Sequence, residues 1–160
     1  MKPLSKLFTA AIVAAAAAFA MPAFAQDGDA GAIRHLMMAT FDKPESPLTV
    51  EPVTIHQNVA VAGWAQGDMG GRALLKRKGE DWVLTLCSGD ALKEAKALQH
   101  FGLTPEEADA MARAVVDAES KLDAALVAKF STFDGVVMMD AEGNHPPADG
   151  HGAAHGTHGG

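Results

Sequence analysis

The stretch that decides the fold is residues 58–88, NVAVAGWAQGDMGGRALLKRKGEDWVLTLCS. It contains three short runs rich in apolar residues, and glycine-containing turns separate them. The runs are Asn58 to Gln66, Arg72 to Lys78 and Trp82 to Ser88, and the turns are Gly67 to Gly71 and Gly79 to Asp81. Runs that follow each other so closely predict consecutive antiparallel strands.

The residues before this stretch extend the pattern. Thr49 to Ile55 reads as a further strand, and Pro52 within it predicts an edge position or a bulge, because proline cannot donate a ladder hydrogen bond. Ala32 to Phe41 has apolar residues at helical spacing, with Asp29 as the expected N-cap. The proline-containing loop 43–47 ends this helix.

The residues after the stretch predict two helices. Asp90 is expected to cap a helix over Ala91 to Phe101. Thr104, Pro105 and Glu107 form a capping-box start, from which the second helix should run to about Lys129. The apolar residues 135–139 are expected to dock on the core, and an extra strand is one option.

These elements predict an α+β domain. It has an N-terminal helix, a four-stranded antiparallel meander and two C-terminal helices packed on one sheet face. The core candidates are Trp64 or Trp82, Leu74 or Leu75, Leu84, Leu86, Leu92, Leu98, Val115 and Leu122.

The two ends of the chain differ from this domain. Residues 1–25 resemble a secretory signal peptide, with a basic start, an apolar alanine-rich run and a small-x-small ending at Ala25. Residues 141–160 are rich in glycine and histidine and contain no large apolar residue, so we expect disorder there. The sequence thus predicts one domain over residues 26–140 in the periplasm, with no membrane attachment after cleavage.

Charge limits the partners. Without the two lysines of the leader, 11 basic residues face 20 acidic ones, which gives a net charge of −9. An acidic chain is poorly suited to nucleic acid or to anionic lipid. Arg72, Lys76, Arg77 and Lys78 form the only basic cluster, which we expect on the rim of a hairpin, with Asp68 as a partner for Arg72.

The histidine-rich end is the clearest sign of metal chemistry. His145, His151, His155 and His158 lie within the last 16 residues, where glycine would let the chain wrap around an ion. Neutral imidazole binds copper, nickel and zinc. The alternative without a metal-binding role is a solvated low-complexity tail that holds no ligand.

Sulfur side chains are the second sign. Thioethers favour Cu(I), and Met37-Met38 and Met138-Met139 are adjacent pairs. His35 and Met38 share a helix face and could form a site, whereas Met37 should point to the core. Cys87, the only cysteine, is either a soft ligand or a small buried hydrophobe. The metal candidates outside the tail are therefore His35, Met38, Cys87, Met138 and Met139.

Several segments resemble one bacterial family. They are residues 38–44, 62–75, Trp82 and 86–92, within a resemblance that covers Ile33 to Leu122. In these segments the chain is similar to the copper uptake system-associated proteins. The resemblance implies a periplasmic accessory to copper import, with copper as the ion bound and other copper-uptake proteins as partners. It implies no ligand set, and the spaced His/Met motif of periplasmic Cu(I) chaperones is missing from the sequence.

Three functions follow from these observations. The first is copper handling, with Cu(I) or Cu(II) bound by the tail or by sulfur. The second is a protein-interaction module with an incidental tail. The third is an enzyme with Cys87 as nucleophile and His56 or His100 as its partner; we expect no enzyme, because no activating arrangement is visible in the sequence.

Overall fold

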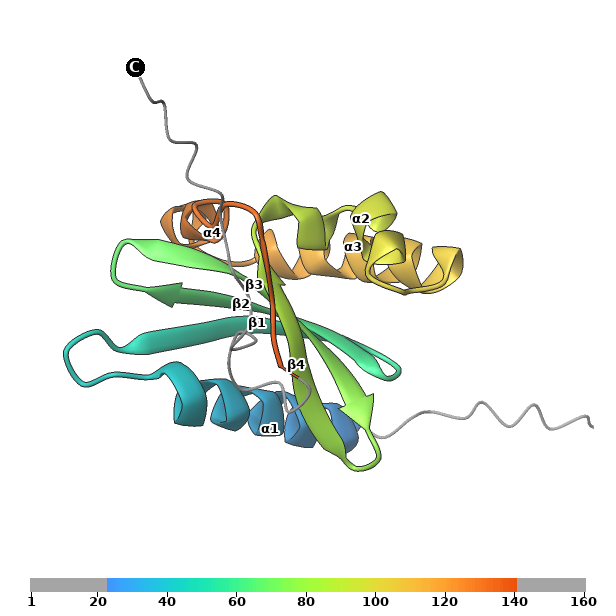
Figure 1. Ribbon diagram of the computed structural model, residues 1–160, viewed down its shortest axis with the longest axis horizontal. Helices are drawn as coiled ribbons and strands as arrows, with labels where there is room; N and C mark the ends of the chain where they lie inside the picture. Colours follow the sequence, from blue (N-terminus) through green and yellow to red (C-terminus); the bar gives the residue numbers. More distant parts are fainter. Residues whose placement is uncertain (1–22, 141–160) are drawn as a thin grey trace, which may run out of the picture.

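The structure, a computed structural model, describes residues 23–140, with side chains from Gly28 onward. Its five strands form one antiparallel sheet in which each strand pairs with its neighbour in sequence (Figure 1). The strands are β1 Leu48–His56, β2 Val59–Gln66, β3 Met69–Lys78, β4 Asp81–Ser88 and β5 Val136–Met138. The predicted α+β meander is confirmed, and the fifth strand comes from the apolar run near Val137.

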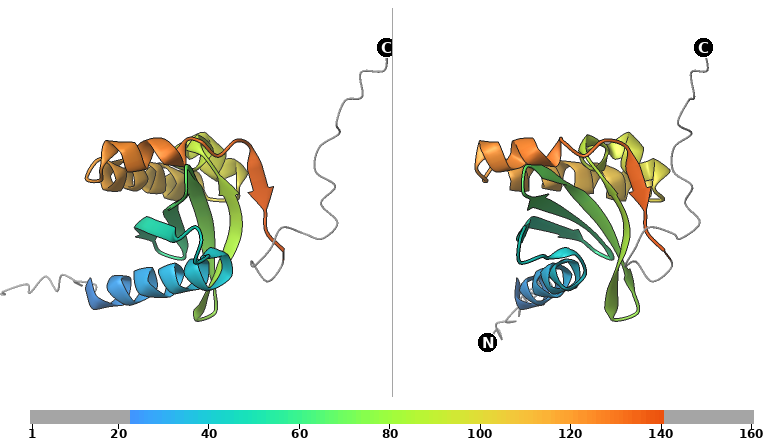
Figure 2. Two further views of the ribbon diagram at one scale, coloured as in Figure 1. Left: turned by 90° about the vertical axis from the view of Figure 1, so that its left-hand side faces the viewer. Right: turned by 60° about the vertical axis from the view of Figure 1, so that its left-hand side comes forward.

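Helices cover both faces of the sheet (Figures 1 and 2). One face carries α1, Ala23–Phe41, and the other carries the C-terminal helices, which are η1 Asp90–Lys93, α2 Ala95–His100, α3 Pro105–Glu119 and α4 Ala124–Phe130. Each interface buries its own hydrophobic cluster. Leu74 and Leu75 are both fully buried, because successive strand residues point to opposite faces and both faces are covered.

The first helix begins earlier than predicted. It starts at Ala23, so Asp29 lies inside the helix and does not cap it. The carboxylate of Asp29 accepts hydrogen bonds from Arg77 and from the indole of Trp82, 3.2 Å away. Alanine is the best helix former, which favours this extension despite two glycines. The expected cleavage point after Ala25 falls within the first turns of α1.

The C-terminal helices are shorter than predicted. The expected helix over 91–101 is interrupted at Glu94, whose backbone is extended, and this break lets Leu92 and Leu98 both reach the core. The capping box of Thr104 and Glu107 is confirmed. The helix it starts ends at Glu119, however, and Asp123 caps the separate helix α4 with hydrogen bonds to two backbone amides.

The turn before β3 is also shorter than predicted. Gly70 and Gly71 lie in the strand, opposite Ala65 and Trp64. A Cβ on Gly71 would lie 2.9 Å from the Trp64 ring and 2.9 Å from Phe133 Cβ. Glycine is therefore needed there so that two aromatic side chains can approach the backbone.

Two irregularities shape the sheet. The pairing of β1 with β2 shifts between Val50 and Val53, so Pro52 occupies both of the predicted situations, an edge strand and a bulge. The pairing of β3 with β4 shifts at Thr85, because Leu74 pairs with Leu86 while Leu75 pairs with Leu84. After this second bulge, each residue of β4 points to the sheet face opposite to the one that regular alternation would give it.

Both ends of the chain fall outside the described residues. They are positions 1–22 of the expected signal peptide and the expected tail 141–160, with its four histidines. Within the described part of the chain, no helix has the length and hydrophobicity to cross a membrane.

Candidate functional site

A cavity of about 220 Å³ lies between the sheet, α1 and the segment that carries β5. Its walls are mostly apolar and include three sulfur-containing side chains. The lining residues are Met37, Phe41, Leu48, Trp64, Gln66, Cys87, Phe133, Val137 and Met139. It is smaller than the cavities of about 300–1,000 Å³ that hold drug-sized ligands, so it suits a single ion or a very small molecule.

The three sulfur residues come from three separate elements. Met37 is on the inward face of α1 and is 2 % exposed, and Cys87, near the end of β4, is 8 % exposed. Met139 directly follows β5, where its amide donates to the carbonyl oxygen of Thr85 over 2.9 Å. The three residues are far apart in the sequence, and only the tertiary fold brings them to one cavity.

The bulge at Thr85 decides which way Cys87 points. Leu84 belongs to the cluster under α1, whereas Leu86 belongs to the cluster under α2 and α3. Two residues of one regular strand at this spacing would share a face. The bulge places Leu86 on the far side and returns Cys87 to the α1 side, opposite Val137 of β5.

Burial keeps the cavity free of charge. Desolvation raises the pKa of the Cys87 thiol from 9.0 to about 12, so the sulfur is protonated at neutral pH. The amide of Gln66 is already engaged, since its Nε2 donates to the carbonyl oxygens of Phe41 at 2.9 Å and Ser46 at 2.8 Å. No Asp, Glu, Lys, Arg or His lines this cavity among the described residues.

Two aromatic rings form one wall. Trp64 and Phe133 meet edge to face, with ring centroids 5.6 Å apart. The indole Nε1 of Trp64 is buried and has no hydrogen-bond partner within residues 23–140. A buried N–H without an acceptor is uncommon in folded proteins. Among the described residues, this wall residue thus carries a buried donor that is not used in a hydrogen bond.

The adjacent methionines divide between the inside and the outside. Met37 lines the cavity while Met38 is 43 % exposed, and Met139 lines it while Met138 is 50 % exposed. His35 is exposed on α1 near Met38. In the described part of the chain, no group of three or more His, Cys, Asp or Glu side chains is placed to hold a metal. Of the five predicted candidates outside the tail, the structure brings Cys87 and Met139 together.

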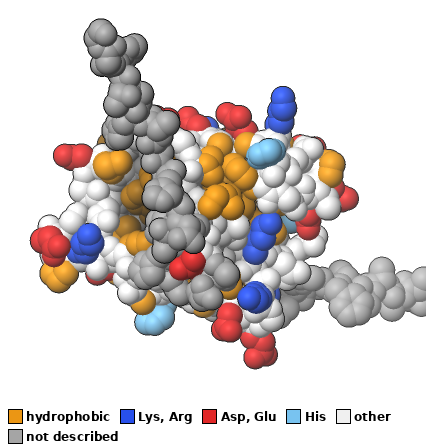
Figure 3. Space-filling view, in the orientation of Figure 1, with side chains coloured by type: hydrophobic (Ala, Val, Ile, Leu, Met, Phe, Trp, Pro, Cys, Tyr) orange, Lys and Arg blue, Asp and Glu red, His pale blue; other side chains and the backbone are white. Residues whose placement is uncertain are grey.

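The outer face of β5 belongs to a hydrophobic patch. Figure 3 shows hydrophobic side chains gathered beside a histidine on this side of the molecule. A shallow groove here is lined by Thr85, Leu86, His100, Phe101, Gly102, Val136 and Met138. His100 therefore lies on this outer groove, and no histidine of the described residues lines the cavity of Cys87.

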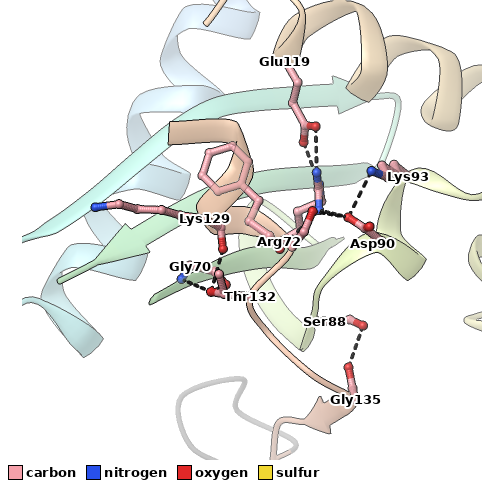
Figure 4. A network of polar contacts seen from close by, with 11 residues as sticks. Gly70, Arg72, Ser88, Asp90, Lys93, Glu119, Lys129, Thr132 and Gly135 are labelled. Atoms are coloured by element: carbon pink, nitrogen blue, oxygen red, sulfur yellow. Dashed lines mark hydrogen bonds and ion pairs between the residues drawn. The ribbon is translucent and has the colours of Figure 1, made fainter. Parts of the chain in front are cut away.

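Arg72 occupies the other face of the sheet. It is fully buried, so the prediction of a basic rim that includes Arg72 was wrong. Its guanidinium donates to both carboxylate oxygens of Glu119, over 2.6 and 2.7 Å, and to Asp90 over 3.1 Å (Figure 4). The expected partner Asp68 is not the one used; the buried guanidinium pairs instead with Glu119, which is itself buried, and with the partly exposed Asp90.

This network also holds the segment that closes the cavity. A hydrogen bond from Ser131, together with Lys93 and Arg72, lowers the pKa of Asp90. Beyond Ser131, the Gly70 amide donates to Thr132 Oγ1 over 3.0 Å, and Ser88 Oγ donates to the Gly135 carbonyl over 2.8 Å (Figure 4). The chain between these anchors brings Phe133 to the cavity, and the strand after them brings Met139.

Sequence reasoning missed Met37, Trp64 and Phe133 as members of the site. Met37 was correctly expected to point inward, and that same orientation places it in the cavity. The usable signal was the inward methionine of each adjacent pair, because Met37 and Met139 line the cavity while Met38 and Met138 are exposed. No local pattern marks Phe133.

Comparison with protein-family models, with curated proteins and with solved structures finds no match.

Proposed function

We propose that this protein is a periplasmic accessory to copper uptake that binds copper as its cargo and passes it to other proteins of the uptake system. One observation carries the proposal: three sulfur side chains from distant parts of the chain, those of Met37, Cys87 and Met139, line one cavity. Thiolate and thioether ligands select soft metal ions, and Cu(I) is the common biological one.

Features of the sequence support the same reading. The leader over residues 1–25 would export the chain to the compartment where incoming copper is first met. The four histidines after residue 140 supply donors that bind copper in either oxidation state. The resemblance to copper uptake system-associated proteins agrees with both features. The alternative, a protein-interaction module, would leave the sulfur side chains as ordinary core residues.

Metal titration of the chain from Gln26 to Gly160 tests the proposal. Cu(I), kept reduced under anaerobic conditions, and Cu(II) are added in separate experiments against competing chelators of known affinity. We expect submicromolar binding of at least one copper ion per chain, and weaker binding of Zn²⁺ and Mg²⁺. Absence of copper binding in both oxidation states would contradict the proposal and favour the interaction module.

A further inference from the structure

We propose that Met37, Cys87 and Met139 bind one Cu(I) ion inside the cavity under α1, as a site separate from the histidine tail. This inference rests on the proposed function and assigns its ligands. The cluster is more than a lone cysteine, because α1, β4 and the residue after β5 each contribute one sulfur. Methionine has three rotatable side-chain bonds, so its sulfur can adjust to an ion within a cavity of this size.

The charge balance of such a site selects a monovalent ion. One thiolate and two neutral thioethers carry a charge of −1, which Cu(I) neutralises completely. A divalent ion would leave a net positive charge in an apolar cavity, and burying an uncompensated charge is costly. Mg²⁺ and Ca²⁺ also require oxygen ligands, whereas Gln66 supplies the only side-chain oxygen that lines the cavity among the described residues.

Binding exchanges a proton for the metal. The Cu(I) ion forms a bond to the sulfur of Cys87, the S–H bond breaks, and the proton passes to solvent, while no electron is transferred. The site is neutral overall both before binding, as a thiol, and after it, as a copper thiolate complex. Neither form therefore places a net charge against the apolar walls of the cavity.

The segment over residues 131–139 would close the site. It supplies Phe133, Val137 and Met139, and it is tied to the sheet by the bonds of Gly70 and Ser88 and by the short β5 ladder. A three-residue strand with an exposed outer face opens more easily than the central strands. A ligand placed there can thus be released without unfolding the remaining sheet.

The adjacent methionines provide matched controls. In a chain whose four tail histidines are changed to asparagine, Met37→Leu and Met139→Leu remove the cavity thioethers. Met38→Leu and Met138→Leu make the same chemical change at their exposed neighbours. Leucine replaces methionine with little change in volume, so all four variants should fold. Cys87→Ala removes the thiolate, and thermal unfolding of each variant confirms that the structure is retained.

Anaerobic competition with a chromogenic Cu(I) chelator measures the outcome. We expect the tail variant to bind one Cu(I), with affinity reduced about tenfold to a hundredfold by each inner Met→Leu change and more by Cys87→Ala. The outer changes should leave the affinity unaltered. Equal effects of inner and outer changes, or no Cu(I) binding by the tail variant, would overturn the site.

The same experiment separates this inference from the proposed function. If the unaltered chain binds copper but the tail variant does not, the protein remains a copper carrier through its tail and the cavity assignment fails. If neither chain binds copper, both proposals fail. A separate titration of the tail variant with benzene gives the third outcome. Binding of benzene without binding of Cu(I) would overturn the metal site and identify a cavity for small apolar molecules.

Discussion

Arg72 and Glu119 form a two-bond ion pair in the protein interior, with Arg72 fully buried and Glu119 7 % exposed. The pair joins β3 to α3, and the same guanidinium reaches the Phe130 carbonyl in α4 over 3.3 Å. This arrangement places the C-terminal helices on the sheet and sets the start of the segment that closes the cavity.

Removing one member of this pair should be strongly destabilising. Glu119→Ala would leave the buried Arg72 charge with the partly exposed Asp90 as its remaining acidic partner among the described residues, and we expect a loss of about 3–5 kcal/mol in the free energy of unfolding. Urea denaturation measures it. Lys121→Ala is the control, since its pair with Asp117 is more than two-thirds exposed and should contribute only about 0–1 kcal/mol. Similar losses in the two variants would contradict the buried pair.

Gly71 should tolerate no side chain. A methyl group there would meet the Trp64 ring, Phe133 Cβ and, at 3.1 Å, the Ser88 carbonyl, so Gly71→Ala should destabilise the fold by about 1–3 kcal/mol. Gly31→Ala has nothing within 4 Å on the helix α1 and should stabilise by about 0.5–1 kcal/mol. Thermal unfolding compares them, and a neutral Gly71→Ala would argue against the aromatic packing.

Some of this fold could be predicted from local sequence alone. The places of the turns between the strands and the capping box at Thr104 each depend on residues close in sequence, and they are confirmed, although the turn before β3 is shorter than predicted. Arg72 was misjudged because its partner Glu119 lies 47 residues away and joins it only after the helix has docked. The break at Glu94 likewise follows from the packing of Leu92 and Leu98.

The candidate site could be predicted only in part. Cys87 and Met139 were candidates because of their chemistry, but the choice between adjacent methionines depends on packing. On β5 the choice also depends on how the strand pairs with β4 beyond the bulge at Thr85. No sequence pattern in this region signals that bulge.

The raised pKa of Cys87 predicts a loss of stability at alkaline pH. Below pH 9 the thiol is protonated in both the folded and the unfolded chain, so it adds no pH dependence. Between about pH 9 and pH 12 only the unfolded chain ionises, and the free energy of unfolding should fall by about 1.4 kcal/mol per pH unit from this group.

Comparison with Cys87→Ala isolates that effect. Urea denaturation of both metal-free proteins at pH 8, 9, 10 and 11 cancels the contributions that lysine and arginine make in common. We expect the stability advantage of the unaltered protein, measured as its free energy of unfolding minus that of Cys87→Ala, to fall steadily above pH 9. A constant difference over this range would mean that the thiol ionises as readily in the folded chain as in the unfolded one, and hence that the cavity is open to water.

The most direct test of the sulfur site observes each methionine separately. The protein is labelled with ¹³C at the methionine methyl groups, its tail histidines are changed to asparagine, and one equivalent of Ag(I), a redox-inert analogue of Cu(I), is added. NMR spectra should show displaced resonances for Met37 and Met139, while those of Met38, Met138, Met69 and Met111 stay unchanged. Displacement of Met38 and Met138 instead, or of no methionine, would contradict a soft-metal site in the cavity.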